Sequence, residues 1–121
     1  MKVKIIAALL LVITVWAALA NTAWLGREIG LYIQRVDELR LTVEGADELA
    51  EDVFADFMKS ETYMSITVNH DDLTNIEGLF SEMVGQLKVG DREGAEVTKD
   101  RLLDALRHLR RLSGINFDSV V

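Results

Sequence analysis

The chain has 121 residues and a formal net charge of -7, and it contains neither cysteine nor proline. The absence of cysteine excludes disulfides, thiolate metal sites, a cysteine nucleophile and a lipid-modified cysteine. Lys2 and Lys4 account for two of the 13 basic residues, so the part beyond residue 25 carries 11 basic and 20 acidic side chains. This balance repels phosphate backbones, and we therefore expect no binding of nucleic acid.

Residues 5–25 form an uncharged, mostly apolar run. At a rise of 1.5 Å per residue, a helix of this length extends roughly 31 Å and is long enough to cross a bilayer. Lys2 and Lys4 precede the run, so the positive-inside rule predicts that residues 1–4 are cytoplasmic and residues 26–121 lie outside the cell membrane. The sequence thus predicts a single-pass anchor in the lipid bilayer, with Trp24 at the outer interface.

A cleaved signal peptide is the alternative interpretation of the same run. Ala18-Leu19-Ala20 matches an A-x-A cleavage pattern before Asn21. Against cleavage, no glycine or proline breaks the helix before Ala18, and the run resumes after Asn21. Cleavage after Ala20 would give a secreted helical protein, and in either case residues 26–121 are extracytoplasmic.

Apolar residues then recur at intervals of three and four, which is typical of amphipathic helices. The first helix is expected to continue the anchor as far as Glu44-Gly45, with a stripe of Leu25, Ile29, Tyr32, Val36, Leu39 and Val43. The second is expected to begin near Ala46, with Ala50, Val53, Phe57 and Met64 on one side and Leu49, Phe54 and Met58 widening that stripe.

Two further helices follow. Asn69-His70-Asp71-Asp72 supplies several possible N-caps for a third helix, which carries Leu73, Ile76, Phe80, Met83 and Leu87. A turn at Val89-Gly90-Asp91 leads to a fourth helix, predicted to end near Ser113-Gly114, with Ala95, Leu102, Leu103, Leu106, Leu109 and Leu112. Arg107, Arg110 and Arg111 are interpreted as cations that oppose the dipole of its last turns.

We therefore predict an all-α fold, in which a transmembrane helix continues into a small extracytoplasmic up-down bundle of four helical segments. This topology requires the chain to reverse near His70. The alternative is a single helix that runs on through that point.

The segment 69–77, NHDDLTNIE, resembles a motif of the bacterial domain-of-unknown-function family 4363, which comprises single-span proteins with a short helical exported region. His70, Asp72 and the triplet 75–77 match the motif, whereas Asn69 and Thr74 stand where the family usually has aspartate. The end of the chain is also similar, although Ser119 replaces an asparagine. The resemblance implies this topology and brings no known reaction, substrate or cofactor.

The residues His70, Asp71, Asp72, Asn75 and Glu77 are the candidate interaction surface, because they are more polar than a turn requires. A metal site there is disfavoured, because His70 has Leu73 and Thr74 at the helical positions where a second ligand would converge. Asp104 and His108 have suitable spacing, but arginines surround them and oppose a cation.

Groups for catalysis are sparse, and no glycine-rich phosphate loop or serine elbow is present. We expect neither an enzyme nor a cofactor. The prediction is a membrane-anchored module that binds another membrane or envelope protein, with an extracytoplasmic ligand or metal sensor as the alternative.

Overall fold

The computed structural model describes residues 1–64 and 68–120, of which residues 113–120 are described in their helical course only. It consists of α1 (Lys2–Asp37), α2 (Ala46–Met64), α3 (His70–Lys88) and α4 (Arg92–Val120). The described parts of the chain contain no strand. The predicted all-α class and the bundle of four helices are confirmed.

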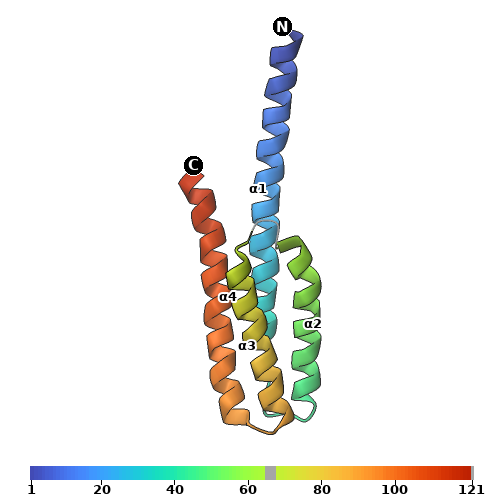
Figure 1. Cartoon of the computed structure of the whole chain (residues 1–121), viewed down its shortest axis with the longest axis vertical. Coiled ribbons are helices and arrows are strands. Elements are labelled where there is room, and N and C mark those ends of the chain that lie inside the picture. The colour runs from blue at the N-terminus through green and yellow to red at the C-terminus, as the bar shows by residue number, and fades with distance from the viewer. Residues whose placement is uncertain (65–67, 121) are drawn as a thin grey trace.

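The helices alternate in direction, and α1 projects far beyond the other three at its N-terminal end (Figure 1). Helix α1 packs against α2 and α4, and α3 packs against the same two helices, so each helix has two antiparallel neighbours. We call the end of the bundle where Leu25 of α1 enters the core the proximal end. The opposite end, with the connections 38–45 and 89–91, is the distal end.

Helix α1 changes character along its length without a break in the helix. All of residues 1–20 are exposed, whereas Leu25, Ile29, Tyr32 and Val36 are buried at the spacing that the sequence predicts. The first part is long and apolar enough to cross a membrane, and none of its 18 most apolar consecutive residues is buried in the bundle. One continuous helix therefore joins a candidate membrane span to the core.

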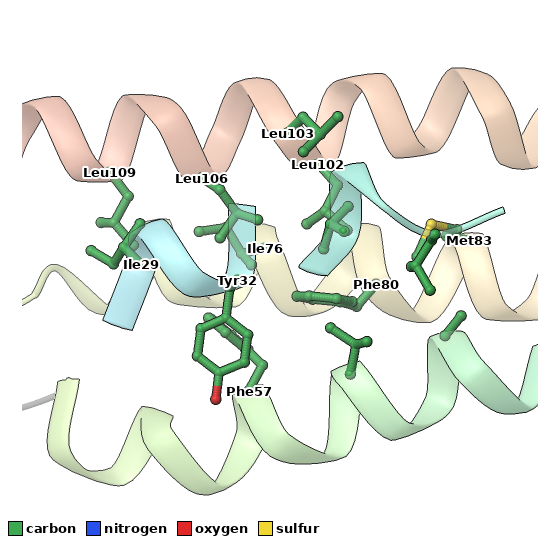
Figure 2. Packing of buried hydrophobic residues seen from close by; sticks show 14 of the residues in the cluster. Ile29, Tyr32, Phe57, Ile76, Phe80, Met83, Leu102, Leu103, Leu106 and Leu109 are labelled. Atoms are coloured by element: carbon green, nitrogen blue, oxygen red, sulfur yellow. The ribbon is translucent and has the colours of Figure 1, made fainter. Parts of the chain in front are cut away.

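The core lies where these stripes meet in the middle of the bundle. Figure 2 shows Tyr32 directed toward Phe57, and Leu109 of α4 beside Ile29 of α1. Phe80 lies between two other rings, with centroid distances of 5.4 Å to Phe54 and 5.3 Å to Phe57. Burial of this cluster is the main force that holds the helices together.

The ends of three helices follow the local signals in the sequence. Asn69 caps α3, because its side-chain oxygen accepts a hydrogen bond from the backbone N–H of Asp71 at 2.9 Å. Asp91 accepts one from the N–H of Gly94 at 2.9 Å at the start of α4. Gly45 and Gly90 have φ angles of 81° and 79°, a left-handed conformation that glycine adopts without steric penalty.

The predicted end of the first helix at Glu44-Gly45 is wrong, because α1 ends at Asp37. The amide of Leu39 donates to the carbonyl of Val36, and the ammonium group of Lys99 donates to the carbonyl of Leu39 at 2.8 Å. Leu41 then becomes buried, whereas Val43, predicted to lie in the stripe, is 39% exposed. The chain thus leaves the helix earlier than periodicity indicates, at a point where α4 contacts it.

Two other expectations are corrected. Leu49 and Met58 do not widen the buried stripe of α2, because both side chains are more than 40% exposed. Helix α4 runs through Ser113-Gly114 to Val120, since in the described residues positive φ angles occur only at Gly45 and Gly90. Arg107, Arg110 and Arg111 are therefore not in the last turn, and complementarity to a helix end does not explain them.

Candidate interaction surface at the proximal end

The first turns of α3 place the predicted interaction residues at the proximal end, beside the point where α1 leaves the bundle (Figure 1). The chain reverses direction before α3, and Asn69 caps the first turn of this helix there. This reversal is the one that the predicted topology requires. Asp71 and Asp72 lie in the first turn, where carboxylates interact favourably with the N-terminal end of the helix dipole.

The five predicted residues do not form one continuous face. At about 100° per residue, His70 and Glu77 lie on the side of α3 that faces α2, whereas Asp71 and Asn75 point away from the core. Asp72 lies on the opposite flank, toward α4. His70, Asp71 and Asn75 are exposed, and Asp72 and Glu77 are half-buried. The accessible surface is therefore narrower than the predicted set.

Glu77 faces Glu61 of α2, a residue that the sequence did not single out. The Oε2 atom of Glu61 is buried and has no fixed hydrogen-bond donor within reach among the described residues. Two ionised carboxylates cannot bond to each other, so a hydrogen bond between them requires one shared proton. This bond to Glu77, together with burial and the neighbouring negative charge, raises the pKa of Glu61 to about 7.

Polar side chains also join α1 to α2 in the proximal half of the bundle. The hydroxyl group of Tyr32 donates to the carbonyl of Asp56 at 2.9 Å or shares a hydrogen bond with Ser60 at 2.7 Å. Burial raises the pKa of the Tyr32 phenol. Arg35 forms an ion pair with Asp56 at 2.8 Å. These contacts set the position of α2 along α1.

Two aromatic side chains mark the proximal boundary of the bundle. Trp24 and Tyr63 meet edge to face, with ring centroids 6.4 Å apart. Trp24 is half-buried, and Tyr63 of α2 is 64% exposed. Indole and phenol rings are enriched at membrane interfaces, and Tyr63 thus accompanies the Trp24 that the sequence predicts there.

The metal hypotheses acquire no support from the geometry. Within residues 1–64 and 68–112, no group of three or more histidine, aspartate or glutamate side chains lies close enough together to hold an ion. Asp104 instead lies 3.8 Å from Arg107, one turn along α4, in an exposed ion pair. His108, the residue that its spacing suggested as a second ligand, is exposed nearby.

Comparison of the chain with protein-family models, curated protein sequences and solved structures gives no match. The resemblance to family 4363 accordingly stays a prediction.

Two functional candidates at the proximal end were missed at the sequence level. Tyr63 follows the apolar stripe of α2, and only the register of α2 against α1 brings it beside Trp24. Glu61 is one of many acidic residues, and its pairing depends on the relative rotation of α2 and α3. Helical periodicity predicts which side of each helix is buried. It does not predict which residue of a neighbouring helix contacts a side chain at the edge of that buried side.

Proposed function

We propose that this protein is a single-pass membrane protein whose helical bundle lies outside the cell membrane and binds another membrane or envelope protein there. It acts as a non-catalytic interaction or accessory module. The observation that carries this proposal is the continuity of α1, in which an exposed apolar part passes without a break into a buried stripe.

The exposed part of α1 supports membrane insertion. Ile5, Leu9, Ile13 and Trp16 are each more than 55% exposed, although they belong to the most apolar part of the chain. A continuous apolar surface of this length is unfavourable in water, and hydrocarbon removes that cost. Lys2 and Lys4 then favour a cytoplasmic N-terminus and an external bundle.

A rigid connection to the anchor restricts what the bundle can reach. Because α1 has no hinge between the span and the core, the proximal end stays at the membrane surface and presents His70, Asp71 and Asn75 there. Exposed polar side chains held at a fixed height suit a partner that is itself in or at the membrane. The acidic side chains in this region favour a partner with basic residues.

Site-specific photo-crosslinking in intact cells tests this proposal. A photoreactive residue replaces His70, Asp71 or Asn75 in turn, and matched variants carry it at the exposed distal positions Glu93 and Glu96. We expect one adduct of defined mass from the proximal positions only. Equal adducts from both ends, or none from either, would contradict a specific partner at this surface.

Signal-peptide cleavage is the alternative that the fold leaves open. The first residue buried in the bundle is Leu25, so removal of residues 1–20 would leave every buried side chain of the core in place. The intact mass of the membrane-bound protein separates the two forms. We propose the uncleaved form, because Trp24 and Tyr63 together form an aromatic boundary suited to a membrane interface.

A further inference from the structure

A groove with one basic wall runs between α1 and α4 on the proximal half of the bundle, since its charged side chains all belong to α4 and α1 contributes Ile33. Its volume is about 1120 Å³, above the usual range for a small-ligand pocket, and it is open on one side. We call it the arginine groove, and it is lined by Ile33, Asp104, Arg107, His108, Arg110 and Arg111. The three arginines are exposed, so their charged groups are accessible to a ligand from solvent or from a membrane surface.

The position of one arginine is set by α1. The guanidinium group of Arg110 lies against Gly30, where a Cβ atom would be 3.7 Å from Cζ of Arg110. Leu109 meanwhile packs beside Ile29 in the core (Figure 2). The groove is therefore held by packing between α1 and α4.

Folding of α4 does not account for this concentration of charge. The helix continues beyond all three arginines to Val120, so none of them interacts with its last carbonyl groups. Among the side chains that the structure describes, Asp104 is the one acidic group that lines the groove, and it lies 3.8 Å from Arg107. An excess of positive charge remains, although the chain as a whole carries a net charge of -7.

The membrane end of the groove lies near the outer edge of the headgroup layer. Gly30 follows Leu25, the last residue of the proposed span, by five residues, which corresponds to about 7.5 Å along the helix. The polar layer on each side of a bilayer is roughly 5–8 Å thick. Arg110 thus lies at the outer edge of this polar layer, and Arg107 lies about one turn farther from the hydrocarbon.

We propose that the arginine groove binds the phosphate group of an anionic phospholipid in the outer leaflet around α1. Guanidinium groups form paired hydrogen bonds with phosphate oxygens, which makes arginine well suited to this ligand. This inference rests on the proposed membrane anchoring of α1. If the groove binds a lipid, α4 faces the membrane surface, and the side of the bundle formed by α3 stays accessible to a partner protein.

The test uses the full chain reconstituted in lipid nanodiscs of phosphatidylcholine, with and without phosphatidylglycerol. Spin-labelled phosphatidylglycerol and phosphatidylcholine report which lipid is held at the protein, by the ratio of their association constants. The groove variant carries Arg107→Gln, Arg110→Gln and Arg111→Gln. The control carries Arg40→Gln, Arg92→Gln and Arg101→Gln, which removes the same charge from three other exposed arginines.

We expect wild type and control to prefer phosphatidylglycerol and the groove variant to lose this preference by about 10- to 30-fold, since three arginines act against Asp104. Replacement of the same three residues by lysine should restore only part of it, because lysine keeps the charge but cannot form the paired hydrogen bonds. Full helicity of the groove variant by circular dichroism excludes unfolding as the cause.

Each other outcome overturns the inference in a recognisable way. An equal loss in the control, or no preference in wild type, overturns the groove as a lipid site while co-elution of the chain with the discs still supports the anchor. Displacement of the labelled lipid by inorganic phosphate would identify a site for free anions instead. Failure of wild type to co-elute with the discs would overturn the anchor itself.

Discussion

Glu61 of α2 and Glu77 of α3 face each other across the proximal end of the bundle, where Glu77 raises the pKa of Glu61 and the two carboxyl groups can share one proton. This pair joins two helices on either side of the chain reversal. It also places a proton-dependent contact within the candidate interaction surface.

The pair predicts that the stability of the bundle falls as the pH rises. The pKa of Glu61 is about 7 in the folded protein and 4.5 in its ordinary state. The folded state therefore binds more protons between these values, so the free energy of unfolding decreases from about pH 4.5 to 7. Because the side chains are only partly buried, we expect a loss on the order of 1 kcal/mol.

Urea unfolding of the full chain in a mild detergent at pH 5 and pH 8 measures this effect. Glu61→Gln keeps a hydrogen-bond donor at both pH values and should be more stable than wild type at pH 8, with a weaker pH dependence. Glu82→Gln, an exposed acid elsewhere on α3, is the control. If the free energy of unfolding of Glu61→Gln and of Glu82→Gln both changed with pH as in the wild type, the shared proton would be refuted.

The ring of Phe80 should be one of the most important side chains for stability. It is fully buried and contacts the rings of Phe54 and Phe57. We expect Phe80→Ala to lower the free energy of unfolding by about 3–5 kcal/mol, because it leaves a cavity in the core. Val97→Ala, at a side chain that is 53% exposed, should change it by less than about 0.5 kcal/mol. Similar values for both variants would place the core elsewhere.

The hydroxyl group of Tyr32 should contribute to the pairing of α1 with α2. Tyr32→Phe keeps the buried ring but removes the hydrogen bonds to Asp56 and Ser60. We expect a loss of about 1 kcal/mol in the free energy of unfolding. Tyr63→Phe is the matched control at an exposed ring and should have little effect. An equal loss from the two substitutions would argue against the buried network.

Lys99 should hold the chain in its turn after α1. Its ammonium group donates to the carbonyl of Leu39, and Lys99→Met removes this bond while keeping much of the aliphatic chain. We expect a loss of about 1–2 kcal/mol and faster hydrogen exchange in residues 36–42. Arg101→Met, at an exposed residue of the same helix, should leave this exchange unchanged. Unaltered exchange in Lys99→Met would show that another contact ends α1.

These contacts explain why some features were predictable from the sequence and others were not. The apolar run, the stripe of Leu25, Ile29, Tyr32 and Val36, and the cap at Asn69 are local patterns, and the structure confirms them. The end of α1 coincides instead with a contact from Lys99, 60 positions away from Leu39. No local pattern contains such a contact.

The candidate site was predictable to a smaller extent. The sequence placed His70 and its neighbours at a chain reversal, and the structure places them there. The sequence did not indicate that His70, Asp71 and Asn75 are exposed whereas Glu77 is half-buried and faces Glu61. The role of these residues in binding a partner remains a proposal.

Labelling of single cysteines with a membrane-impermeant maleimide in washed, intact spheroplasts shows on which side of the membrane the bundle lies. The natural chain has no cysteine, so Val97→Cys in α4 and Val3→Cys near the N-terminus each report one position without background. Both side chains are exposed. We expect labelling of Val97→Cys in the membrane fraction at once, and of Val3→Cys only after permeabilisation. Protection of Val97→Cys, or its release into the wash, would contradict an external bundle held by α1.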